Sequence, residues 1–243
     1  MKTRKAKLIH SRVLIKLSGE ALADTRGNGL QIEALKRFAK EFVELKKLGV
    51  EIAIVIGGGN FLRGENFSQN GFDRVTADQM GILFTVVNGL ALRSALLAAG
   101  IEVELFAAIA IPGIVDIYHR QKALQALEAG RILILTAGVG LPFVSTDMAA
   151  SLRAIELNAD IILKASTVDG VYTADPKQNK KAKRYDHLSY EVALQNKLRI
   201  MDLSAIHLCQ DHDMPIRVFD MNKPSVLKNI VQGLSEEGTL ISN

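Results

Sequence analysis

The chain has 243 residues, carries a formal net charge of +4 and is 48% hydrophobic. This apolar content can bury a substantial core and excludes disorder over most of the chain. The single cysteine excludes an intrachain disulfide and fits a reducing compartment. Because the charge is mild and Trp is absent, little is available to stack bases, so we expect no nucleic-acid partner.

Residues 1–11 form a basic tail without the apolar stretch of a secretory signal. We expect no segment with the uninterrupted apolar length that spans a bilayer, and therefore a cytoplasmic protein without a membrane partner. Residues 12–243 alternate between strand and helix patterns with no linker. This alternation predicts one α/β domain with a mostly parallel sheet covered on both faces.

The first predicted strand, Arg12–Leu17, has Lys16 near its end and is followed by Ser18 and Gly19. Ligands of open α/β sheets bind at the carboxyl ends of strands, so this lysine is expected to contact a phosphate. The alternative is an edge lysine whose ammonium group reaches water. Apolar residues then recur at helical spacing from Ile32, and Gly49 ends that predicted helix.

The second predicted strand, Val50–Ile56, runs directly into three glycines, Gly57 to Gly59. Glycines remove side chains where a backbone must approach a ligand closely. Arg63 follows four residues later, and a guanidinium group suits a phosphate. The alternative is a flexible turn with a surface arginine.

A long helix is predicted to open at Thr76 and to run to about Ala99. Its expected buried positions are Leu83, Val86, Val87, Leu90 and Leu97. Asp78 in the first turn is either a favourable partner of the helix dipole or an acceptor for ribose hydroxyls, and alone it favours the dipole. The later predicted strands are Val103–Ile109, Ile132–Leu135, Ile161–Leu163, Pro215–Asp220 and Thr239–Ile241, and the later helices are Asp116–Ala129 and Pro224–Val231.

The segment Ile132–Asp147 combines a strand, a loop with Gly138 and Gly140, and a helix start at Ser145. This geometry directs backbone N–H groups and a positive helix end at one point, where a phosphate is the natural ligand. An ordinary βα loop is the alternative.

Lys164 repeats the pattern of Lys16 at the end of another strand. The two lysines together favour a phosphate clamp.

Glycine loops follow three predicted strands, which provides more anion-binding groups than one phosphate chain needs. A donor nucleotide and a phosphorylated acceptor would use them. The chain has no P-loop, no G-x-G-x-x-G and no G-x-S-x-G motif. The basic run at 177–184 is predicted to be a solvated loop, with an accessory nucleotide or RNA contact as the alternative. His207, Cys209 and His212 fit no standard zinc spacing and are set aside.

Seven segments follow one another in an order and spacing that resemble a known family: KLSGEAL (Lys16–Leu22), VIGGGNFLRG (Val55–Gly64), DQMG (Asp78–Gly81), NGLALR (Asn88–Arg93), LKASTVDGVYTADP (Leu163–Pro176), MDLSA (Met201–Ala205) and PIRVFDMNKP (Pro215–Pro224). The family is the bacterial UMP kinases, a branch of the amino-acid-kinase fold. The resemblance implies a three-layer αβα sandwich. It also implies phosphoryl transfer from ATP, with Mg²⁺, to UMP in pyrimidine nucleotide biosynthesis. A homohexamer with GTP as activator and UTP as inhibitor is implied as well.

The resemblance also implies roles for individual residues. Lys16 and Lys164 would contact the transferring phosphoryl group, and Asp147 would orient the two lysines. Asp147 is also the one protein group expected near Mg²⁺, directly or through water. The implied ATP contacts are Lys16, Leu17, Ser18, Gly19, Gly59, Arg63, Ser166, Tyr172 and Asp175. The implied UMP contacts are Gly58, Asp78, Val139, Gly140, Leu141, Pro142, Phe143, Val144, Ser145 and Thr146.

The acceptor loop is where the chain departs from this family. UMP kinases usually read TGNPFFTTD, whereas this chain reads VGLPFVSTD from Val139 to Asp147. Leu141 replaces an amide that could hydrogen-bond the nucleotide. Two rival interpretations remain: a kinase of the same fold that acts on a carboxylate or carbamate, and a nucleotide-binding protein without catalysis. Asp78 argues against the first, and the presence of Lys16, Asp147 and Lys164 argues against the second.

Overall fold

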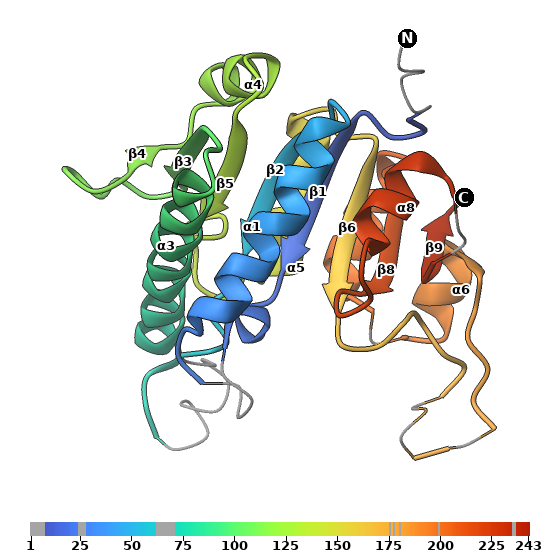
Figure 1. Ribbon diagram of the computed structural model, residues 1–243. Coiled ribbons are helices and arrows are strands. Elements are labelled where there is room, and N and C mark those ends of the chain that lie inside the picture. Colours follow the sequence, from blue (N-terminus) through green and yellow to red (C-terminus); the bar gives the residue numbers. More distant parts are fainter. Residues whose placement is uncertain are drawn as a thin grey trace, which may run out of the picture.

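The computed structural model describes residues 8–23, 28–61, 71–174, 176, 178–179, 181–198, 200–234 and 237–243. In these residues all strands belong to one nine-stranded sheet, in the order β4-β3-β5-β2-β1-β6-β8-β9-β7 (Figure 1). The strands are β1 Arg12–Leu17, β2 Glu51–Ile56, β3 Val103–Ala107, β4 Asp116–Ile117, β5 Ile132–Thr136, β6 Ile161–Ser166, β7 His187–Ser189, β8 Ile216–Asp220 and β9 Thr239–Ser242. Only β8 and β9 pair antiparallel among the described pairs, so the predicted mostly parallel sheet is confirmed.

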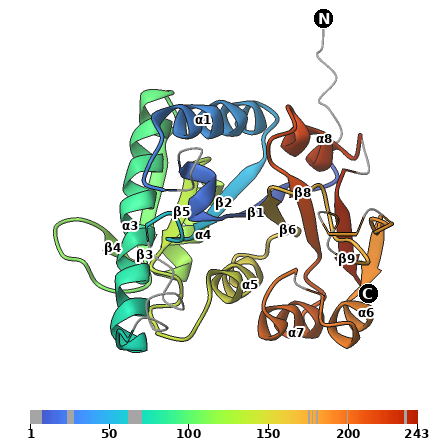
Figure 2. The same cartoon turned by 90° about the horizontal axis from the view of Figure 1, so that it is seen from below.

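Helices cover both faces of this sheet, as expected (Figure 2). They are the 3-10 helix η1 Gly19–Leu22 and the α-helices α1 Ile32–Lys47, α3 Arg74–Ala98, α4 Arg120–Glu128, α5 Thr146–Glu156, α6 Tyr190–Gln195, α7 Leu203–Asp211 and α8 Val226–Gln232. Residues of α1, α3 and α8 share one core with Ile15 of β1, whereas residues of α4 to α7 share the other core with Leu14. This alternation along β1 is the period of two expected of a strand buried on both faces.

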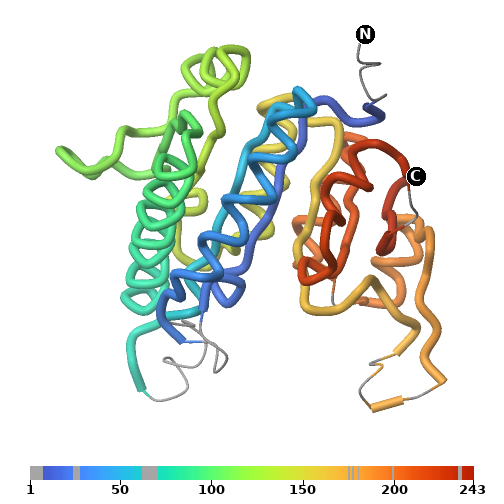
Figure 3. The backbone as a smooth tube through the Cα atoms, in the orientation of Figure 1, coloured from blue at the N-terminus to red at the C-terminus, as the bar shows by residue number. Residues whose placement is uncertain are grey.

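The course of the chain places β1 and β6 at the middle of the sheet. In Figure 3 the half that contains α3, β3 and β5 is traced before the half that contains β8 and β9. Strand β1 pairs with β2 on one side and with β6 on the other. The boundary between the basic tail and the domain stays a prediction, because residues 1–7 are not among the described residues.

Three predicted helix starts are wrong, and one of them is that of α8, which begins at Val226 rather than at Pro224. The segment from Asp116 begins as the short strand β4, which pairs with Phe106 and Ala107 of β3, and helix α4 starts only at Arg120. Helix α3 starts earlier than predicted, because the side chain of Asp73 accepts a hydrogen bond from the N–H of Thr76 and caps it. Strand β7 and helices α6 and α7 had no predicted counterpart.

The buried face of α3 also differs from the prediction. Leu83, Val87 and Leu97 are 51%, 42% and 49% exposed, whereas Thr85, Asn88 and Gly89 are buried. A Cβ atom at Gly89 would lie 2.3 Å from Thr136 Cγ2 of β5, so small and polar residues allow the helix to approach the sheet. By length and mean hydropathy, α3 could span a membrane, which corrects the expectation that no segment is long and apolar enough.

Candidate active site

Strand register brings the two predicted lysines together. Lys16 of β1 and Lys164 of β6 are directly paired neighbours in parallel strands. The side chains of Leu14 and Ile162 belong to the core shared with α5. Lys16 follows Leu14 by two residues, and Lys164 follows Ile162 by two residues. Because side chains alternate along a strand, both lysines point to this same face, at the carboxyl ends of the strands.

Asp147 completes a compact cluster of three charged groups. It lies in the first turn of α5, which Ser145 caps by accepting a hydrogen bond from the N–H of Met148. Lys16 Nζ is 3.0 Å from Asp147 Oδ1, and Lys164 Nζ is 2.9 Å from Oδ2. The three side chains are only 11%, 16% and 14% exposed for Lys16, Lys164 and Asp147. We refer to Lys16, Asp147 and Lys164 as the charged triad.

Burial and charge act against each other in the triad. Burial tends to raise the pKa of Asp147, but the ammonium groups of Lys16 and Lys164 outweigh it, so the pKa lies below its ordinary value. The pKa of Lys164 is lowered, first by burial and further by Lys16, although Asp147 opposes the shift. The triad therefore carries net positive charge in a mostly buried site, which suits an anionic substrate.

Two of the glycine loops, the one at Gly19 after β1 and the one at Gly57 to Gly59 after β2, are in close backbone contact. A Cβ atom at Gly19 would lie 2.8 Å from both Gly57 O and Gly59 N, so no larger residue fits there. The N–H of Gly57 donates to Leu17 O at 2.9 Å, which continues the β1–β2 ladder into the loops. Close packing of bare backbone leaves N–H groups available to a phosphate.

The acceptor loop borders a cavity of about 540 Å³, which we call the acceptor cavity. Predicted residues line it on both sides: Gly58, Asp78, Leu141, Phe143, Val144, Ser145 and Thr146. Gly59, which we expected at the ATP phosphates, lines this cavity too. Val139, Gly140 and Pro142 belong to the same loop without being part of the described cavity lining.

Asp78 is the centre of a contact between α3 and the acceptor loop. Arg74 Nε donates to both carboxylate oxygens, at 2.9 and 3.0 Å, and the N–H of Phe143 donates to Oδ2 at 2.9 Å. The Arg74 guanidinium also lies 5.4 Å from the centre of the Phe143 ring. We call this contact the Arg74 latch. It ties the loop to the helix at the point where a ribose was expected.

The acceptor loop has a strained backbone. Ala137 and Phe143 have φ angles of 61° and 64°, a region that residues with a Cβ atom rarely adopt. Thr85 of α3 stabilises the first of these by accepting a hydrogen bond from the N–H of Ala137 at 2.7 Å. The latch stabilises the second. The loop conformation therefore depends on contacts with α3 at two points, Ala137 just before the loop and Phe143 at its middle.

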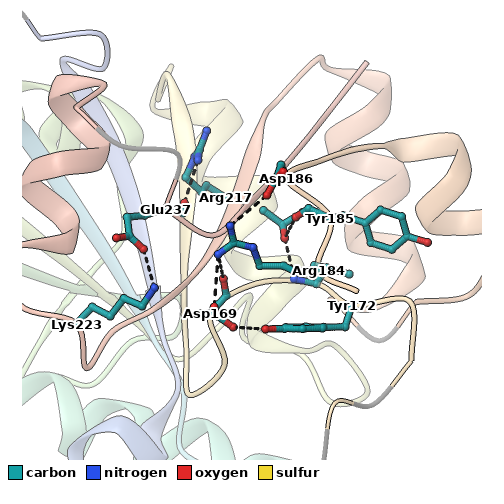
Figure 4. Close-up of polar contacts among 10 residues, drawn as sticks. Asp169, Tyr172, Arg184, Tyr185, Asp186, Arg217, Lys223 and Glu237 are labelled. Carbon is teal, nitrogen blue, oxygen red and sulfur yellow. Dashed lines mark hydrogen bonds and ion pairs between the residues drawn. The ribbon is translucent and has the colours of Figure 1, made fainter. Parts of the chain in front are cut away.

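A second cavity, of about 580 Å³, has Lys164 of the triad in its lining, and we call it the donor cavity. The predicted ATP residues Ser166 and Tyr172 line it. Figure 4 shows that Asp169 accepts a hydrogen bond from the Tyr172 hydroxyl, at 2.6 Å, and is paired with Arg184. Arg184, the last residue of the basic run, thus pairs with the carboxylate that holds the hydroxyl group of Tyr172 in the cavity lining.

Other predicted residues have different positions. The side chain of Leu17 is 1% exposed and lies in the core, so only its backbone can reach a nucleotide. Arg63 and Asp175 lie outside the described residues. The prediction missed Arg74, Asp202 and Ser204, which line the acceptor cavity. The spacing of four between Arg74 and Asp78, typical of an ion pair along a helix, was the available signal for the first.

Comparison with known proteins identifies the family. The model of the amino acid kinase family matches residues 11–220. This chain belongs to the amino acid kinase family. Uridylate kinases of Pseudomonas putida and Aliivibrio fischeri are 52% and 49% identical to it, over 96% and 99% of this chain and 94% and 99% of their own. Within the family, the chain therefore belongs with the uridylate kinases.

Solved structures agree with this amino acid kinase assignment. The crystal structure of a UMP kinase from Bacillus anthracis superposes with a TM-score of 0.92 at 42% identity, over 96% of each chain. A UMP kinase from Ureaplasma parvum gives a TM-score of 0.90 at 32% identity, over 96% of this chain and 99% of its own. The predicted fold is thus confirmed, and the chain is a nucleoside monophosphate kinase by descent.

Proposed function

We propose that this chain transfers the γ-phosphoryl group of ATP to UMP, giving ADP and UDP. The observation that carries the proposal is the position of the triad between two cavities. Lys164 lines the donor cavity and pairs with Asp147, whose neighbour Thr146 lines the acceptor cavity. Two nucleotides bound in these cavities would bring their phosphates to the triad from opposite sides.

The triad supplies what this reaction needs from a protein. A phosphate monoester already carries a charge of about −1.5 to −2 near neutral pH, so its attacking oxygen requires no general base. The protein must offset the repulsion between two anions and align them. Lys16 and Lys164 supply positive charge, and Asp147 fixes both ammonium groups within 3.0 Å of its carboxylate.

The described residues do not form a magnesium site of their own. No group of three acidic, histidine or cysteine side chains could hold a metal among them, and both oxygens of Asp147 face ammonium groups. Mg²⁺ prefers several oxygen ligands and commonly binds through substrate phosphates. We therefore propose that Mg²⁺ enters as the MgATP complex, as part of the substrate.

Self-association, regulation and location rest on the resemblance. We propose a cytoplasmic homohexamer that GTP activates and UTP inhibits. The exposed apolar side of α3, with Met80, Leu83, Val87 and Leu97, supports contact between copies of the chain. Light scattering of the purified protein tests the homohexamer, and a monomer at all concentrations would contradict self-association.

A coupled assay of ADP release tests the reaction. UMP, CMP, dUMP and acetylglutamate are offered side by side with MgATP. We expect turnover with UMP well above the other acceptors. Turnover with another acceptor and none with UMP would overturn the proposal.

A further inference from the structure

Two buried amides lie behind the glycine loop. Asn60 ends the loop and Asn88 belongs to α3, and they are 3% and 0% exposed. The Nδ2 group of each donates to Oδ1 of the other, at 3.0 Å from Asn60 and 2.8 Å from Asn88. The remaining N–H of each side chain reaches backbone: Asn88 donates to Gly57 O at 2.7 Å, and Asn60 donates to Gly29 O at 2.6 Å. Both NH₂ groups are therefore fully used.

The bond from Asn88 fixes the direction of one peptide unit in the loop. In a trans peptide the C=O and N–H groups point to opposite sides. Because Asn88 holds the C=O of Gly57, the N–H of Gly58 in the same unit points away from the amide pair. Gly58 lines the acceptor cavity. A glycine peptide flips easily unless it is fixed, and a flip here would leave a buried amide without its acceptor, which is unfavourable.

The same helix sets both sides of the acceptor cavity. Asn88 holds the glycine loop through Gly57 O, and Thr85, less than one turn earlier, holds the acceptor loop through the N–H of Ala137 at 2.7 Å. Asp78 at the start of α3 also lines the cavity. One rigid helix thus determines the distance between two loops that follow different strands.

We infer that Asn88 is a positioning residue, which directs the Gly58 N–H at the phosphate of the acceptor during transfer. Asn60 supports Asn88 by pairing with its amide. The inference rests on the proposed function for the identity of the ligand, a nucleoside monophosphate. The sequence motifs contain both asparagines, but nothing in their order along the chain shows that they meet.

Asn88→Asp tests the inference with almost no change of shape. The ionised carboxylate cannot donate to Gly57 O, and it repels that carbonyl oxygen. We expect kcat and kcat/KM for UMP to fall together by about 10²-fold at pH 8, as for loss of a preorganised donor. Burial raises the pKa of a carboxyl group, and its protonated form can donate again. The loss relative to wild type should therefore shrink as the pH falls, whereas Asn88→Ala should show no such recovery.

Two further variants separate positioning from general stability. Asn60→Asp keeps the bond from Asn88 to Gly57, so we expect a smaller loss of kcat than in Asn88→Asp. Tyr190→Phe is the matched control, because it removes another buried side-chain bond to a backbone carbonyl, that of Met214, far along the chain from the loop. Equal losses at positions 60 and 88 without recovery at low pH, or a wild-type kcat in folded Asn88→Asp, would overturn the inference.

The assay with UMP, CMP, dUMP and acetylglutamate distinguishes a failure of this inference from a failure of the proposed reaction. Wild-type turnover with another acceptor and none with UMP would contradict the proposed function, and the variants would then be compared on that acceptor. Hydrogen exchange of the peptide spanning 55–61 gives a readout without turnover. We expect UMP to protect these amides in wild type and to protect them less in Asn88→Asp. Equal protection in both proteins would contradict the role of Asn88.

Discussion

The charged triad and the acceptor loop lie next to each other and are built in opposite ways. The triad is buried, and its lysines are placed by the register of two central strands. The loop is exposed, with Leu141 and Phe143 61% and 68% accessible, and contacts from α3 determine its shape. In the proposed reaction the triad would act on the transferring phosphoryl group whatever the acceptor, whereas the loop would contact the acceptor itself. Changes should therefore affect turnover at the triad and acceptor affinity at the loop.

The largest expected effect follows from removing the charge of the triad's carboxylate. Asp147→Asn leaves two ammonium groups without the anion that aligns them, and we expect kcat to fall by about 10²–10³-fold, as for loss of a preorganised electrostatic group. Steady-state kinetics with UMP and MgATP measure this. Near-wild-type kcat would remove Asp147 from the mechanism.

Glu51→Gln is a suitable control for that variant. Glu51, the first residue of β2, pairs at 2.5 Å with Arg12, which lies at the opposite end of β1 from Lys16, and the side chain of Glu51 is 29% exposed. It therefore loses a partly buried ion pair without touching either cavity. We expect an unchanged kcat, so that a loss shared by both variants would indicate damage to the sheet rather than to the triad.

Breaking the Arg74 latch should have the next largest effect, and on a different constant. Arg74→Gln removes a charge-assisted hydrogen bond to Asp78. Such bonds contribute about 1.5–3 kcal/mol, and the 41% exposure of Arg74 favours the lower end. We expect KM for UMP to rise about tenfold with kcat and KM for ATP unchanged.

The control for the latch is Arg37→Gln. Arg37 also lies over an aromatic ring, 5.1 Å from the centre of Phe38, and donates to Asn222, but it lines neither of the two described cavities. A KM for UMP that stays constant or falls in Arg74→Gln would show that the latch only closes the free protein and contributes nothing to acceptor binding.

Leu141 offers a smaller test of the same loop. Its apolar side chain is exposed and lines the acceptor cavity. The usual loop sequence of the UMP kinases has an asparagine at this position. Leu141→Asn adds an amide that can form a hydrogen bond to the nucleotide, worth about 1 kcal/mol, so we expect KM for UMP to fall about fivefold. Leu234→Asn, at another exposed leucine, is the control. A higher KM would mean that Leu141 packs against the nucleotide.

The same contrast explains what the sequence could predict. Lys16 and Lys164 could be placed together because strand period and the carboxyl-end rule are local patterns. The contacts of Arg74 with Phe143, and of Asn60 with Asn88, join segments far apart in the chain, and no local pattern specifies them. The exposed leucines of α3 were predicted as buried because hydropathy alone cannot tell a core face from a face that is free in one chain.

The smallest expected effect concerns acid stability, and it again separates the triad from the loop. The folded pKa of Asp147 is lowered because the two lysines outweigh the effect of burial. The same group in the unfolded chain titrates near its ordinary value of about 3.9. Below about pH 4 the unfolded chain therefore binds more protons than the folded one, and the free energy of unfolding falls as the pH falls. Because Asp147→Asn lacks this proton, the difference in Tm between wild type and variant should shift against wild type from pH 5 to pH 3, while Leu141→Asn follows wild type. Parallel Tm curves for wild type and Asp147→Asn would mean that Asp147 has the same pKa in both states.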